Sequence, residues 1–80
     1  MNTKHAVAER ITILCAERNL TPNALATLAG IPPMTLYGIL GEKSQNPGIV
    51  TIKKLCDALE ITLSEFFSTT EFDQLEQEIR

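Results

Sequence analysis

The side chains that most often do chemistry in proteins are few in this 80-residue chain, and their spacing does not bring them together. The chain has one histidine, His5, and two cysteines, Cys15 and Cys56, with no CxxC spacing. No serine or cysteine has a plausible histidine partner for nucleophilic catalysis, and there is no glycine-rich phosphate loop. The acidic residues fall on polar helix faces, where a catalytic carboxylate pair is not expected. We therefore expect no enzyme activity and neither a metal nor a cofactor, and we interpret both cysteines as reduced core residues.

The composition is that of one small globular domain. The chain is 44% hydrophobic and 21% charged and has no Trp, which is enough apolar material for a single core. No apolar run approaches the ~20 residues that a membrane span requires, and the N-terminus lacks the apolar core of a signal peptide. We expect a cytoplasmic protein with no membrane partner.

The net charge of −3 is unevenly distributed along the chain. Residues 1–54 contain six basic and three acidic residues and have a net charge of +3. Residues 55–80 contain one basic and seven acidic residues and have a net charge of −6. The acidic pI of the whole chain therefore does not exclude a mildly basic face on its first two thirds.

Hydrophobic periodicity predicts helices along the whole chain, and no segment alternates as a half-buried strand does. A first helix is expected over residues 4–18, closed by Asn19 in the left-handed conformation. Its inward stripe is Val7, Ile11, Leu14 and Cys15. The second helix is expected to begin with Thr21 as N-cap and Pro22 in the first turn, and to end at Gly30 with positive φ. Its expected apolar face is Ala24, Leu25, Leu28 and Ala29.

Three further helices are expected in the rest of the main domain. A short third helix over residues 33–40 follows Gly30 with almost no loop between them. After the polar loop EKSQNPG, Gly48 is expected to cap a fourth helix in IVTIKKLCDALE, and Thr62 to cap a fifth in LSEFF. The predicted inward residues are Leu36 and Ile39, then Ile49, Ile52, Leu55, Cys56 and Leu59, then Leu63, Phe66 and Phe67.

Two short helices joined through Gly30 with few intervening residues define a helix-turn-helix. Residues 7–67 resemble the lambda-repressor/Cro-like helix-turn-helix regulators, also called the XRE family. The resemblance is carried by LTPNALATLAGIPPMTLYGIL, by the KSQNP loop and by TIKKLCDALEITLSEFF. It implies an all-α, compact five-helix bundle, to which this chain adds a short C-terminal helix. It also implies a transcriptional regulator, acting as a repressor, that binds double-stranded DNA as a homodimer.

The resemblance implies that the helix over residues 33–40 lies in the major groove with its N-terminal half facing the bases. The residues carried over as base-facing are Pro33, Met34, Tyr37 and Gly38. The expected phosphate contacts are Thr21, Asn23, Thr35, Lys43, Ser44, Gln45 and Asn46. None of the base-facing residues offers a bidentate hydrogen bond to guanine or adenine, so Met34 and Pro33 are expected to contact thymine methyl groups.

The missing polar base contacts and the negative net charge leave a second interpretation open. In this alternative the chain is an antitoxin-like or accessory protein-interaction module on the same fold. Its surface from Met34 to Tyr37 would then contact another protein. Neither interpretation calls for a small-molecule ligand.

The chain is expected to divide into a helix-turn-helix domain over residues 1–69 and an acidic amphipathic helix over residues 70–80, capped by Thr70. The apolar stripe of that helix is Phe72, Leu75 and Ile79. A lone helix of about ten residues is unstable in water unless its stripe is covered. It either folds back on its own bundle or pairs with a second copy. The resemblance favours pairing, with a two-fold contact centred near Phe72 and Leu75.

Overall fold

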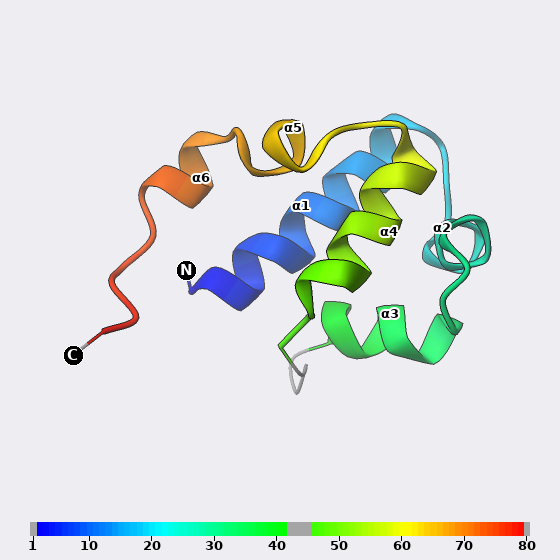
Figure 1. Ribbon diagram of the computed structural model, residues 1–80, viewed down its shortest axis with the longest axis horizontal. Coiled ribbons are helices and arrows are strands. Elements are labelled where there is room, and N and C mark those ends of the chain that lie inside the picture. The colour runs from blue at the N-terminus through cyan, green and yellow to red at the C-terminus, as the bar shows by residue number, and fades with distance from the viewer. Residues whose placement is uncertain (1, 42–45, 80) are drawn as a thin grey trace.

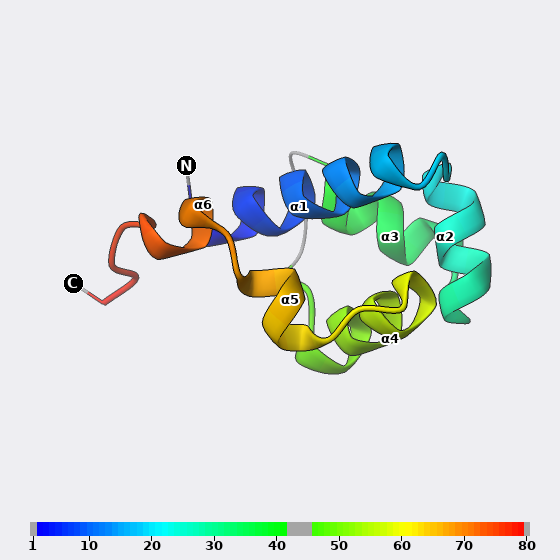
Figure 2. The same cartoon turned by 90° about the horizontal axis from the view of Figure 1, so that it is seen from above.

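The computed structural model describes residues 2–41 and 46–79, which form an all-α fold (Figure 1). The helices assigned in these residues are α1 (Thr3–Glu17), α2 (Pro22–Ala29), α3 (Pro33–Leu40), α4 (Ile49–Leu59), α5 (Leu63–Phe67) and α6 (Thr70–Asp73). None of the described residues lies in a strand. Helix α2 packs against both α3 and α4. Helix α1 packs against α3, and its N-terminal end lies against α6 (Figure 2). The predicted five-helix bundle with an added C-terminal helix is confirmed.

The local signals around the two central helices act as the sequence predicts. The Thr21 hydroxyl caps α2 by accepting a hydrogen bond of 3.1 Å from the backbone N–H of Ala24, and Pro22 begins the helix. Gly30 ends α2 with a φ of 70°, a conformation that costs glycine nothing. Only Ile31 and Pro32 lie between Gly30 and the start of α3, so the two helices form a tight helix-turn-helix.

The core lies between these helices and is built from the predicted stripes. The buried residues that form it are Val7, Ile11, Leu14, Cys15, Leu25, Ala26, Ile31, Leu36, Ile39, Ile52, Leu55, Cys56, Leu59 and Phe66. Leu36 and Ile39 lie on one face of α3 and are buried in this core. The face of α3 that bears Met34 and Gly38 is left outward as a consequence.

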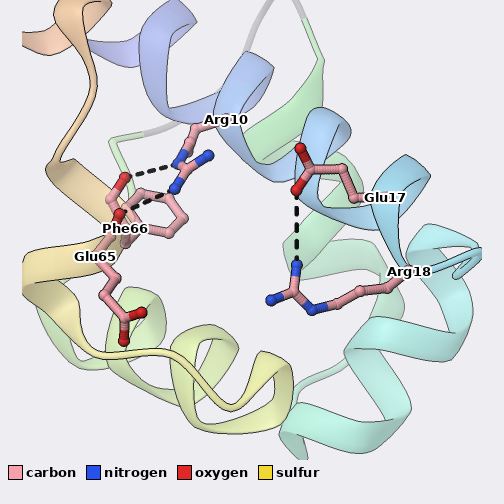
Figure 3. A network of polar contacts seen from close by, with 5 residues as sticks. All are labelled: Arg10, Glu17, Arg18, Glu65 and Phe66. Atoms are coloured by element: carbon pink, nitrogen blue, oxygen red, sulfur yellow. Dashed lines mark hydrogen bonds and ion pairs between the residues drawn. The ribbon is translucent and has the colours of Figure 1, made fainter.

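Helix α5 is held against α1 by a polar contact. Its N-terminus carries a capping box between Thr62 and Glu65. At its other end, Arg10 of α1 donates hydrogen bonds to the carbonyl oxygens of Glu65, at 2.9 Å, and Phe66, at 2.8 Å (Figure 3). The last carbonyl groups of a helix have no intrahelical hydrogen-bond donor. The Arg10 guanidinium supplies donors to two of these carbonyl groups in the five-residue helix α5.

Two residues predicted to point inward are exposed. Leu28 is 62% exposed, because the buried side of α2 is centred between Leu25 and Ala26 and Leu28 lies on its flank. Ile49 is 60% exposed. It is the first residue of α4 and stands at the edge of the stripe that continues through Ile52, so the packed helices do not cover it.

The C-terminal helix is much shorter than predicted. Helix α6 spans only Thr70–Asp73, and its N-cap is Thr69 rather than Thr70, with no side-chain cap hydrogen bond. Phe72 packs on the rings of Phe66 and Phe67, with centroids 6.1 and 4.9 Å away. Beyond this aromatic contact the chain is no longer helical, and Ile79 is 87% exposed. A stripe that nothing covers cannot hold a short helix together.

Candidate nucleic-acid interface

Helix α3 presents all four predicted base-facing residues on its exposed side. Met34 is 85% exposed and Tyr37 is 49% exposed. Pro33 and Gly38 are also exposed. The sequence of α3, PMTLYGIL, carries no charge, so the surface that it offers is apolar apart from the hydroxyl groups of Thr35 and Tyr37.

A groove of about 400 Å³ runs between α3 and the start of α4. Its lining includes Met34, Thr35 and Gly38 from α3 together with Asn46 from the preceding loop. The structure therefore brings two predicted base-facing residues together with two predicted phosphate contacts. Pro33 and Tyr37 do not line this groove.

The start of α2 provides the second group of predicted phosphate contacts. Thr21 and Asn23 are both exposed there. The Thr21 oxygen is occupied as the helix cap, but its hydroxyl proton is still available for a phosphate oxygen, because a hydroxyl donates and accepts at once. The positive end of the α2 dipole favours an anion at the same place.

The loop between α3 and α4 is only partly described. Lys43, Ser44 and Gln45, which the sequence predicts as phosphate contacts, lie outside the described residues. Asn46 is described, and it is exposed beside the groove.

Sequence reasoning missed the contribution of α4 to this surface. Thr51 of α4 lines the groove opposite α3, together with Pro47 and Gly48 just before the helix. Gly48 was expected only as a helix cap, which it is, with no side-chain cap hydrogen bond. The sequence did contain a signal for this contribution. Helices α3 and α4 are close together along the chain, so the start of α4 is expected to lie near α3.

The two thiols are separate from this surface and are built into the core. Burial raises the pKa of Cys15 and also that of Cys56, where nearby Lys53 partly opposes the effect. Both side chains are therefore neutral thiols at physiological pH. Among the described residues, no three His, Cys, Asp or Glu side chains are grouped so as to hold a metal ion. In the same part of the chain, no helix is both long and apolar enough to cross a membrane.

Comparison with known proteins defines the class to which this fold and surface belong. The family model of the Cro/C1-type helix-turn-helix (HTH) DNA-binding domain matches residues 10–71. The chain belongs to this family of DNA-binding domains, which is not a family of enzymes. Among curated proteins, none matches the chain.

Two solved structures are similar to this chain. The crystal structure of the prophage Lp1 protein 11 has 34% sequence identity and a TM-score of 0.82, and the match covers 94% of this chain and 100% of that one. An HTH_3 family transcriptional regulator from Vibrio cholerae has 31% identity and a TM-score of 0.73. That match covers 81% of this chain and 36% of the regulator, so this chain corresponds to about a third of the larger protein.

Proposed function

We propose that this protein is a transcriptional regulator, acting as a repressor, that places α3 in the major groove of double-stranded DNA. The observation that carries the proposal is the division of α3 into two faces. Leu36 and Ile39 are buried in the core, while Pro33, Met34, Tyr37 and Gly38 are exposed. A short helix fixed by its inner face, with its N-terminal half exposed, is how helix-turn-helix proteins enter the major groove.

The chemistry of the exposed face supports apolar readout of the bases. Met34 and Pro33 have no group that forms hydrogen bonds with guanine or adenine, whereas the thymine methyl group is an apolar surface in the major groove. We infer that the protein prefers A·T pairs opposite Met34. Gly38 adds no side chain to the floor of the groove, so the DNA can approach α3 closely there.

The polar residues around α3 support anchoring to phosphates. Thr21 and Asn23 stand at the start of α2, and Thr35 and Asn46 stand beside the groove. Lys43, Ser44 and Gln45 are proposed as further contacts on the sequence alone. Such contacts position a protein on the duplex without specifying its sequence.

A salt series tests this function directly. Binding to a random-sequence duplex is measured by fluorescence anisotropy. The logarithm of the association constant should fall linearly with the logarithm of the salt concentration. Lys43→Ala should weaken binding to all duplexes alike and lower the slope by ~1. Lys53→Ala is the matched control and should leave the slope unchanged, because Lys53 pairs with Asp57 on the side of α4 opposite Thr51. An absence of salt-dependent binding to any duplex would overturn the proposed function.

We also propose that two copies bind a two-fold-related pair of half-sites. Because Phe72 packs on Phe66 and Phe67 of its own chain, Leu75 and Ile79 are the apolar residues left at this end for a contact between copies. Sedimentation of the wild type and of Leu75→Glu, with and without a selected duplex, tests the assembly. Two copies per duplex support the proposal, and one copy per duplex contradicts it.

A second candidate function is favoured by one observation, the absence of charge on the exposed face of α3. An apolar surface bearing Met34 and Tyr37 also suits a protein partner, as in an antitoxin-like or accessory module. The salt series separates the two functions, because this module would show no binding to duplex DNA at any salt concentration.

A further inference from the structure

The end of the chain beyond α6 carries acidic residues back towards the start of α1. Residues 71–79 contain four acidic residues and no basic residue. We call residues 74–79 the acidic tail, after Glu76 and Glu78. In both views it lies at the end of the molecule where α1 begins (Figures 1 and 2).

A hydrogen bond fixes the acidic tail at that place. The Thr3 hydroxyl donates to Glu78 Oε2 at 2.7 Å, across 75 positions of sequence. Thr3 is the first residue of α1, a helix of 15 residues. The positive end of its dipole attracts the Glu78 carboxylate, in addition to the hydrogen bond.

From this position, Glu78 shares a cavity with Asn46, one of the residues proposed to contact phosphates. The charged side chains that line a cavity of about 520 Å³ are Glu78 and Lys4, and its lining also includes Asn46 and Pro47. Asn46 and Pro47 line the groove beside α3 as well. A cavity of this size is roughly 10 Å across, which is about the Debye length at 0.1 M salt. A phosphate held at Asn46 would be attracted by the Lys4 ammonium and repelled by the Glu78 carboxylate, so the tail cancels an attraction that Lys4 would otherwise exert.

We propose that the acidic tail is a built-in brake on DNA binding. Held at Thr3, the tail places negative charge in the cavity that Asn46 lines and lowers the affinity for duplex DNA. This inference rests on the proposed function. A condition that draws the tail away from Thr3 raises the affinity without altering any contact made by α3.

The size of the effect follows from Coulomb's law. Two like charges ~10 Å apart in water repel enough to change a binding constant about twofold at low salt. Salt screens this repulsion, so the effect shrinks as the salt concentration rises.

The test uses variants of the 80-residue chain and a random-sequence duplex at low and high salt. Glu78→Gln should bind about twofold more tightly at low salt. This gain should disappear at high salt. Thr3→Val releases the tail without changing the charge, and it should also bind more tightly.

Glu60→Gln is the matched control for net charge. Glu60 is the C-cap of α4, about 18 Å along the helix from Gly48, and its replacement by Gln changes the net charge by the same amount. Equal gains for Glu78→Gln and Glu60→Gln, or no gain for Thr3→Val, would overturn the brake. If the wild type binds duplex DNA and Glu78→Gln binds no better, only the brake fails. If no variant and no wild-type sample binds, the proposed function fails with it.

Discussion

Arg10 contacts Phe66 twice, once through the backbone and once through the ring. Its Nε donates a hydrogen bond of 2.8 Å to the Phe66 carbonyl oxygen, and its guanidinium carbon lies 6.0 Å from the centroid of the Phe66 ring. Phe66 is fully buried and is the one buried residue of α5. A helix of five residues is not stable alone. Arg10 therefore stabilises α5 against the bundle by contacting Phe66, the residue that α5 buries in the core.

Replacing Arg10 with Met should therefore destabilise the fold. Two charge-assisted hydrogen bonds are lost, of which the one to Phe66 is partly buried, and we expect a cost of about 1–3 kcal/mol. In a domain of this size, the melting temperature should fall about 4–8 °C for each kcal/mol. Thermal unfolding monitored by circular dichroism measures this fall in melting temperature.

Arg18→Met is the matched control for this prediction. Within the described residues, the Arg18 side chain forms an ion pair with its neighbour Glu17 at 3.9 Å (Figure 3), and exposed pairs of this kind contribute little. Equal melting temperatures for Arg10→Met and Arg18→Met would show that the contact with α5 is not stabilising.

The parts of the fold that were predictable from sequence are those with local causes. Thr21, Pro22 and Gly30 set the bounds of α2 through their own backbone preferences, whatever packs around them. The burial of Leu36 and Ile39 follows from their spacing on α3. Leu28 and Ile49 were predicted wrongly, because residues at the edge of an apolar stripe are covered only if a neighbouring helix reaches them, and spacing does not reveal that.

The contacts between distant segments left no pattern in the sequence. The hydrogen bond from Arg10 to Phe66 and that from Thr3 to Glu78 each join opposite parts of the chain. The length of α6 was overestimated because helical spacing alone does not say whether Ile79 finds a surface to cover it. At the candidate interface, Thr51 was missed since its role depends on how α4 faces α3. DNA contact by the predicted residues stays a prediction.

The stability of the protein should decline at alkaline pH because of its two buried thiols. Burial raises the pKa of Cys15 and of Cys56 above the ordinary value of 9.0. The folded state thus favours the neutral thiol, and this stability is fully present below pH 9. It is lost as the pH rises towards the folded-state pKa, because the unfolded chain ionises first.

Melting temperatures between pH 7 and pH 10.5 test this, with Cys15→Ala combined with Cys56→Ala as the comparison. The double variant should be less stable at pH 7, since it leaves small cavities, but its melting temperature should fall less steeply above pH 9. Parallel declines would show that the thiols do not contribute.

Met34→Ala should alter DNA preference without altering stability. Met34 is 85% exposed, so truncation removes little packing, and surface substitutions usually change stability within about ±0.5 kcal/mol. Selection of binding sites from a random library should show a weaker preference at A·T pairs. Leu36→Ala, at a fully buried position of the same helix, should instead cost about 2–5 kcal/mol. A large loss of stability in Met34→Ala would contradict the assignment of this face.

Gly38→Ala should make the protein more stable and its DNA binding weaker. Glycine inside a helix costs about 0.5–1 kcal/mol relative to alanine. A Cβ built at Gly38 meets no heavy atom within 4 Å, so nothing in the fold requires glycine there. The melting temperature should therefore rise by several degrees. The added methyl group would stand in the groove beside Met34 and Thr35, where crowding against the DNA should weaken binding about tenfold.

Gly41→Ala is the matched control for the gain in stability. A Cβ at Gly41 would lie 3.2 Å from the Tyr37 carbonyl oxygen, so this substitution should not stabilise the protein. The two measurements on Gly38→Ala, melting temperature and duplex affinity, are predicted to move in opposite directions. A variant that gains stability and binds DNA as tightly as the wild type would show that no DNA surface approaches α3 at Gly38.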